Sequence, residues 1–168
     1  MRRVILAIVA VLFTVGIASA QNYIVVDSEK IFKSLDEYNN ALEQIDALKK
    51  HYQESVDAKF QEVEQFYNTY MQQRAYLTAT ARQQVEQQIL DLEAQATQYQ
   101  ESLFGNDGEL MKRRMELIQP IQQRVFTAIE NVSKQYGYDL VIDIAANPTV
   151  LYYSEKVNFT EYIIEALK

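Results

Sequence analysis

The chain has 168 residues, 48% of them hydrophobic, and carries 16 basic against 23 acidic side chains, for a net charge of −7 at pH 7. This acidic balance argues against nucleic acid or an anionic membrane as a partner recognised by charge alone. The sequence contains no cysteine, so the fold must be held by packing rather than by disulfides.

The first twenty residues have the pattern of a secretory signal peptide. Two arginines at positions 2 and 3 precede an apolar run over 4–15, and small residues follow at 18–20. We therefore predict cleavage between Ala20 and Gln21, which leaves the mature chain outside the cytoplasmic membrane. The alternative is an uncleaved membrane anchor, but the apolar run is shorter than the roughly 20 residues that span a bilayer.

A short strand is expected at the start of the mature chain. Residues 23–26, Tyr-Ile-Val-Val, are aromatic and β-branched, which is typical of a buried strand. Asp27 or Ser28 then follows as a helix cap, because either side chain can accept from the first free amides of a helix.

Two very long helices are expected next. Between Gly16 and Gly105 there is no glycine and no proline, and apolar residues recur every three or four positions. The pattern predicts a helix over about 36–77, a reversal at 77–80 capped by Thr78 or Thr80, and a second helix up to Leu103. Roughly 40 residues at 1.5 Å each give an arm about 60 Å long. Adjacent helices with matching stripes favour an antiparallel hairpin.

The apolar stripe where the two helices meet, called the seam here, is expected to be incomplete. In a heptad frame the first helix contributes Leu42, Ile45, Lys49, Tyr52, Val56, Lys59, Val63, Phe66, Tyr70 and Gln73. The second contributes Val85, Ile89, Leu92, Ala96, Tyr99 and Leu103. A well-buried apolar side chain contributes about 1.5–3 kcal/mol to the free energy of unfolding. Lys49, Lys59 and Gln73 would contribute little of that. We therefore predict a loosely clamped arm.

The pattern changes after the hairpin. Residues 104–109 interrupt the second helix, either as a hinge or as a plain connector, and a third helix passes Pro120 and ends at Gly137. Strands are predicted over 138–144 and 149–153 as an antiparallel pair. A helix over 161–167 is expected to follow, with Tyr162, Ile163 and Leu167 facing the core. These elements are too few to enclose an independent core, so several copies are expected to assemble.

The residues carry no signature of catalysis or of a cofactor. His51 is the single histidine and has no neighbours at ligand spacing. No phosphate-binding loop, nucleophile motif or metal cluster is recognisable. We therefore predict a protein that is not an enzyme and needs no cofactor.

Taken in order, several segments resemble the Skp/OmpH family of periplasmic chaperones, in its Bacteroidetes branch. They are V-V-D-S-E-K-I-F (25–32), the tyrosine- and glutamine-rich hairpin, G-N-D-G-E-L (105–110), L-I-Q-P-I-Q (117–122), Y-G-Y-D-L-V-I-D (136–143) and V-N-F-T (157–160). The resemblance covers essentially the whole mature chain, 21–168, as one domain. No single motif is specific, but their order is.

The resemblance implies a mainly α fold in which a long helical hairpin, the tentacle (36–104), extends from a small strand-rich body (21–35 and 105–168). It also implies a jellyfish-shaped homotrimer in the periplasm, whose tentacles hold unfolded outer-membrane β-barrel proteins without ATP. The implied trimer-body residues are Tyr23, Ile24, Val25, Val26, Leu140, Val141, Ile142, Val150, Leu151 and Tyr152. The best-studied relatives are strongly basic, whereas this chain is acidic, so binding to lipopolysaccharide does not carry over.

Tyrosine suits a surface that holds unfolded chains, because its ring offers apolar area while its hydroxyl tolerates water. The candidate client contacts near the reversal are Phe66, Tyr67, Tyr70, Met71, Tyr76 and Leu77. Phe66 and Tyr70 can instead belong to the seam, and the off-seam residues can simply be exposed. Both alternatives stay open.

Two other functions fit part of the pattern. An exported coiled-coil spacer of the cell envelope would share the signal peptide and the heptads, but it does not explain the strands at both ends or the many tyrosines. A membrane-active hairpin needs an uninterrupted apolar stripe or a basic face, and the sequence has neither.

Overall fold

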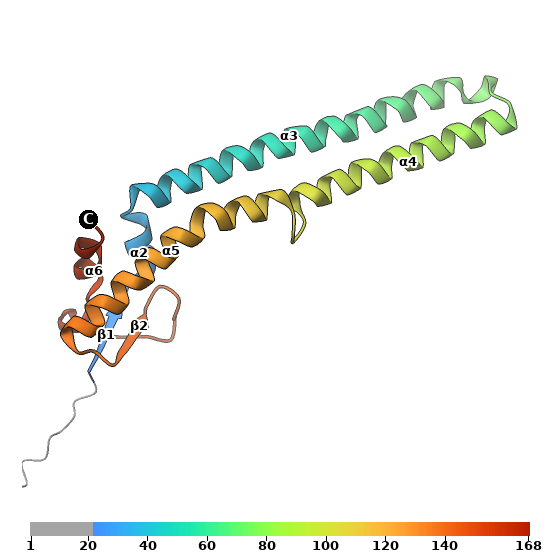
Figure 1. Ribbon diagram of the computed structural model, residues 1–168. Coiled ribbons are helices and arrows are strands. Elements are labelled where there is room, and N and C mark those ends of the chain that lie inside the picture. The colour runs from blue at the N-terminus through green and yellow to red at the C-terminus, as the bar shows by residue number, and fades with distance from the viewer. Residues whose placement is uncertain (1–21) are drawn as a thin grey trace, which may run out of the picture. The chain divides into compact units, whose positions relative to one another are not determined.

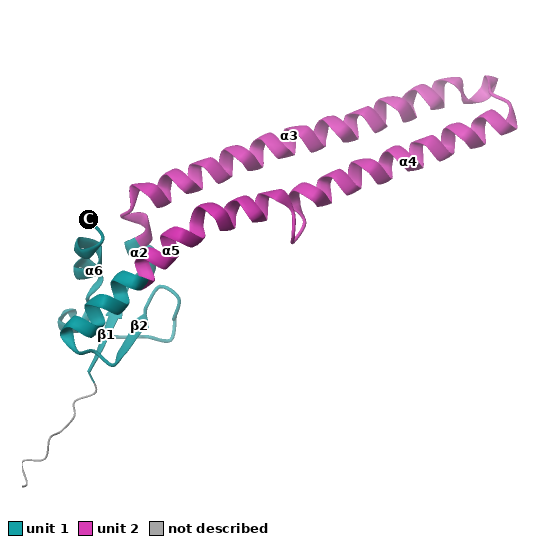
Figure 2. Ribbon diagram, in the orientation of Figure 1, with its two compact units in different colours: residues 1–31, 127–168 teal, residues 32–126 magenta. Residues whose placement is uncertain are grey.

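A computed structural model describes residues 22–168 (Figure 1). The predicted signal peptide and its cleavage site at Ala20 and Gln21 lie outside the described residues. The described residues are mainly helical and form one small sheet, which confirms the predicted fold class. It divides into two compact units, one of residues 22–31 with 127–168 and one of residues 32–126 (Figure 2). The predicted single domain, with its body and tentacle boundaries, stays a prediction.

The first unit is built on a two-stranded parallel sheet. β1 (Tyr23–Val26) pairs with β2 (Leu140–Asp143), in register from end to end. Ile24, Val25 and Val26 are buried, as their β-branched side chains predicted. On its second edge β1 meets the segment after η2 (Glu155–Val157), where the Phe159 amide donates to the Val25 carbonyl at 2.9 Å.

The predicted strand over 149–153 is wrong. Val150, Leu151 and Tyr152 are not in a strand, and the side chains of Leu151 and Tyr152 are 93% and 85% exposed. In a pairing strand the backbone amides of Thr149 and Val150 would donate to β2, but here they are hydrogen-bonded within a turn at Asn147. The Thr149 amide donates to the Asn147 side chain at 3.3 Å, and the Val150 amide donates to the Asn147 carbonyl at 3.2 Å. β2 therefore pairs in parallel with β1 instead of folding back as a hairpin.

Residues far apart in sequence meet where β1 ends. The Asp27 carboxylate caps α2 (Ser28–Lys33) by accepting from the Lys30 amide at 2.9 Å, as predicted. The amide of Asp27 in turn donates to the hydroxyl of Thr160 at 2.9 Å. That hydroxyl is buried and donates to the Asn158 side chain at 2.7 Å. Thr160 therefore fastens the last helix to the first strand.

We expect Thr160→Val to lower the free energy of unfolding by about 1–2 kcal/mol. Valine keeps the shape of threonine but leaves the Asp27 amide without its acceptor. Urea denaturation followed by circular dichroism measures the change. Thr149→Val removes a hydroxyl from an exposed turn and is the matched control, expected to change stability by less than about 0.5 kcal/mol. Equal losses in the two variants would contradict the assignment.

The last helix, α6 (Thr160–Ala166), begins one residue before the predicted position. Ile163 and Leu167 are buried, as predicted. The prediction that Tyr162 faces the core is wrong, since its side chain is exposed. Its ring instead stacks on Phe159, with ring centroids 4.7 Å apart.

The second unit contains the helical hairpin. α3 (Asp36–Gln73) and α4 (Ala79–Phe104) run side by side in opposite directions, joined through η1 (Arg74–Tyr76) (Figure 1). Thr78 caps α4 by accepting from the Ala81 amide at 3.2 Å. The predicted hairpin and its reversal are therefore confirmed.

The seam differs from the heptad frame near the start of α3. Val56, Val63 and Tyr70 are buried as predicted, but Leu42 and Lys49 are exposed. One residue earlier in each case, Ala41 is buried and Leu48 is half-buried. A straight helix drifts about 20° per heptad, so four heptads back from Tyr70 the frame is off by about 80°. Near the start of α3 the seam is therefore better filled with apolar side chains than the heptad frame predicted. Lys59 and Gln73 are exposed, as their polarity suggests, and Tyr99 lies partly outside the seam.

A short loop, 105–108, separates α4 from α5 (Glu109–Tyr136) and projects from the helix line (Figure 1). Gly108 is buried in this loop, and a Cβ atom on it would lie 2.8 Å from the Leu103 carbonyl oxygen. Any other residue would clash there, so the close approach of the backbone requires glycine. α5 continues through Pro120 and ends in the predicted cap, where Gly137 has φ +73° and the Tyr138 amide donates to Ser133.

Candidate functional site

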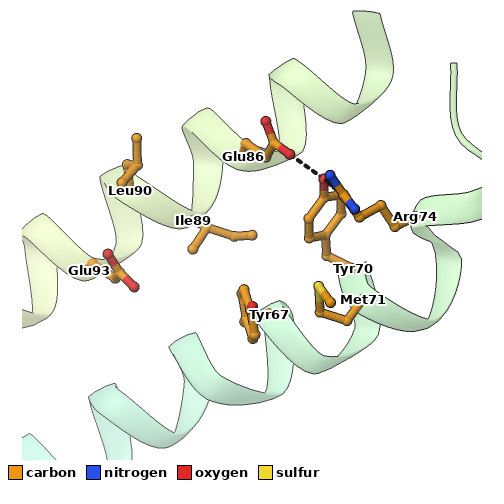
Figure 3. Close-up of a pocket in the computed structure, with 8 residues that line it drawn as sticks. All are labelled: Tyr67, Tyr70, Met71, Arg74, Glu86, Ile89, Leu90 and Glu93. Atoms are coloured by element: carbon orange, nitrogen blue, oxygen red, sulfur yellow. Dashed lines mark hydrogen bonds between the residues drawn. The ribbon is translucent and has the colours of Figure 1, made fainter. Parts of the chain in front are cut away.

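A groove of about 490 Å³ lies between α3 and α4, next to the reversal of the hairpin. We call it the tip groove. Its lining residues are Tyr67, Tyr70, Met71, Arg74, Glu86, Ile89, Leu90 and Glu93 (Figure 3).

The floor of the tip groove is buried and its rim is apolar. Tyr70 and Ile89 form the floor, and both are buried in the seam. Tyr67, Met71 and Leu90 lie at the rim and are 46%, 49% and 57% exposed. Large apolar side chains left half in water can lose further water when an apolar partner covers them. The groove therefore offers a contact surface that is apolar and open.

A polar contact ties the two helices together at this groove. The Tyr70 hydroxyl donates to the Glu86 carboxylate across the seam (Figure 3). The Nε of Arg74 donates to the Tyr70 hydroxyl oxygen at 3.2 Å. This hydrogen bond, followed by the charge interactions with Tyr70 and Glu86, raises the pKa of the Arg74 guanidinium above its ordinary value. The contact fixes the Tyr70 ring as the floor of the groove.

The structure brings together three of the six predicted client contacts. Tyr67, Tyr70 and Met71 line the tip groove. Tyr70 is buried in the seam, which was one of its two alternative assignments, and it also lines the groove. Phe66 is half-buried along the seam, Tyr76 is almost fully exposed in η1, and Leu77 follows it. The role of all six in binding a client stays a prediction.

Sequence reasoning missed the half of the groove that α4 supplies. Leu90 and Glu93 lie there, together with the seam residue Ile89. A single helical stripe does not give the register between two paired helices, so these residues could not be matched to Tyr67 and Met71. The available signal was Leu90, a large apolar residue directly beside a seam position.

Two further properties concern the described part of the chain. Over 22–168, no three or more His, Cys, Asp or Glu side chains are grouped so that they could hold a metal ion. In the same range, every helix is too short or too polar to cross a membrane.

Comparison with known protein families identifies the family to which the chain belongs. Residues 22–167 fit the family model described as outer membrane protein (OmpH-like). No curated protein matches this chain.

Proposed function

The chain belongs to the OmpH-like outer membrane protein family, a family of periplasmic chaperones, and from this premise we propose that it is an ATP-independent holdase. In this proposal the exported protein binds unfolded outer-membrane β-barrel proteins in the periplasm and keeps them from aggregating. The observation that carries the proposal is the tip groove, which gathers exposed apolar side chains of both hairpin helices around one concave surface.

The chemistry of the groove suits such a client. Strands of a membrane barrel alternate apolar and polar residues, and they expose the apolar ones as long as they are unfolded. Tyr67, Met71 and Leu90 can cover such side chains without requiring a fixed geometry, because methionine and tyrosine adapt to irregular surfaces. Phe66, Tyr76 and Leu77 do not line the groove, but they lie within a few residues of it in sequence, and we include them as candidate contacts. The carboxylates of Glu86 and Glu93 keep its border hydrated.

The test is suppression of aggregation. An outer-membrane β-barrel protein is diluted from urea in the presence and absence of the mature chain, and light scattering is followed without ATP. A holdase lowers the scattering and forms a complex that co-elutes in gel filtration. An exported spacer protein would leave the scattering unchanged, which would refute the proposal.

We also propose that three copies assemble through the sheet-containing unit. β2 has one unpaired edge among the described residues, and Leu140 near it is exposed. The side chains of Leu151 and Tyr152, which lie outside any helix or strand, are almost fully exposed. Exposed apolar side chains beside an open strand edge favour association with another chain. The acidic charge of the chain gives no reason to add lipopolysaccharide to the partners.

Sedimentation velocity at micromolar concentration tests the assembly. We expect the mature chain to sediment as a trimer and Leu151→Glu to shift it towards monomer, because the new charge would have to be buried in the contact. Tyr76→Glu places the same charge on an exposed residue of the hairpin and should leave the trimer intact. A wild-type chain that is folded and monomeric under these conditions contradicts the proposal.

A further inference from the structure

A second groove lies at the opposite end of the hairpin from the reversal, between α3 and α5. Two adjoining pockets of about 340 and 290 Å³ share Met111 and Arg114 in their linings. We call them together the α3–α5 groove. The two helices are linked beside it by an ion pair, in which Arg124 donates to Glu37 at 2.6 Å. The groove therefore lies between helices that are held together.

Part of the wall of the α3–α5 groove is apolar and adaptable. Leu42, Met111 and Met115 line it and are exposed. With Met71 in the tip groove, every methionine of the described chain lines one of the two grooves and is exposed. Methionine is unbranched and polarisable, and it is over-used on surfaces that bind varied partners. The exposure of these methionines in two grooves, rather than in a core, is typical of a binding surface.

The charge of the groove is opposite to that of the chain. Lys49 and Arg114 line it, against the single carboxylate of Asp46, whereas the whole chain carries a net charge of −7. Arg113, the neighbour of Arg114, does not line the groove and is paired with Glu116 at 2.7 Å. Arg114 has no ion pair within the described residues. Its guanidinium is therefore available to a carboxylate, which it can bind through two parallel hydrogen bonds.

Two amides distinguish between possible anionic ligands. Gln119 and Gln122 line the groove three residues apart and hence on one face of α5. Each amide can donate and accept, which matches the amide and carbonyl groups of a peptide backbone. The hydrocarbon chain of a fatty acid would offer neither amide a hydrogen-bonding partner. The segment from Met111 to Gln122 spans about 16 Å at 1.5 Å per residue, which accommodates about five residues of extended chain.

We propose that the α3–α5 groove binds an extended polypeptide segment in which apolar side chains flank a carboxylate. The apolar side chains would lie against Leu42, Met111 and Met115, the carboxylate would pair with Arg114, and the backbone would meet the two glutamines. This inference rests on the proposed function, because it describes a second binding site for an unfolded client. It also gives an acidic chaperone a local means of selecting acidic segments.

Fluorescence anisotropy with two labelled ten-residue peptides tests this inference on the mature chain. Both peptides alternate valine and serine, and they differ only in a central glutamate or lysine. We expect the glutamate peptide to bind about tenfold more tightly, and Arg114→Gln to reduce this preference to about twofold or less. Arg113→Gln removes the same charge outside the groove and should keep the preference. Circular dichroism verifies that both variants remain folded.

Equal binding of the two peptides, or equal losses of the preference in the two variants, overturns the inference. Dodecanoate binding that depends on Arg114, without any preference between the peptides, would assign the groove to a fatty acid and overturn it as well. Suppression of aggregation is measured in parallel. If the wild type suppresses aggregation but does not distinguish the peptides, only this inference fails. If it does not suppress aggregation, the proposed function fails.

Discussion

Replacing Ile163 with alanine is expected to lower the free energy of unfolding by about 2–5 kcal/mol, the usual cost of emptying a fully buried aliphatic site. Ile163 has no exposed surface. It lies in α6, whose first residue, Thr160, is hydrogen-bonded to the end of β1. The unit has a small core, so few neighbouring side chains can relax into the cavity. Urea denaturation followed by circular dichroism measures the loss.

Ile164→Ala is the matched control, because it makes the same chemical change one residue later, at a position that is only half-buried. We expect it to cost less than half as much, since part of the removed surface was already in water. Similar losses at the two positions would show that helix propensity, and not burial of Ile163, dominates the energetics of α6.

The double substitution of Tyr67 and Met71 by serine is expected to weaken the binding of an unfolded β-barrel protein about 30- to 150-fold. Each side chain is about half exposed in the free protein, and covering the remaining apolar surface would contribute about 1–1.5 kcal/mol per residue. Titration of a fluorescently labelled unfolded barrel protein with the mature chain measures the affinity. The chaperone would need a correspondingly higher concentration to suppress aggregation.

The control for this experiment removes two aromatic side chains from the same hairpin outside both grooves. Phe60 and Tyr99 are partly exposed and line neither groove. Their double substitution by serine should weaken binding by less than about threefold, which is below 1 kcal/mol. Equal losses in the two double variants would mean that clients bind anywhere on the hairpin, and the tip groove would have no special role.

The parts of the fold that sequence reasoning predicted correctly depend on nearby residues. The absence of glycine and proline marked the hairpin, and single residues marked helix caps, such as Thr78 before α4 and Gly137 after α5. The caps are determined by residues within one turn, so no knowledge of the tertiary fold was needed.

The incorrect predictions depend on contacts between distant residues. The pairing of β1 with β2 is invisible in either strand alone, so the second strand was assigned to a local hairpin partner around Leu151. The exposure of Leu42 results from a small angular error that accumulates along a long helix. The tip groove needs the register between α3 and α4, and for that reason only its α3 half was predicted.

The meeting of the chain's first and last segments has a consequence for the order of folding. The link between Ser28 and Asp143 spans 115 residues of sequence, and the link between Asp27 and Thr160 spans 133. The link between Tyr70 and Glu86 spans only 16. Contacts that close short loops form first, so the reversal of the hairpin can form before the two ends of the chain meet. The apolar strand at 23–26 completes its contacts only when the last residues of the chain are present. A chain truncated before residue 160 is therefore expected to form the hairpin but to leave the sheet-containing unit incomplete.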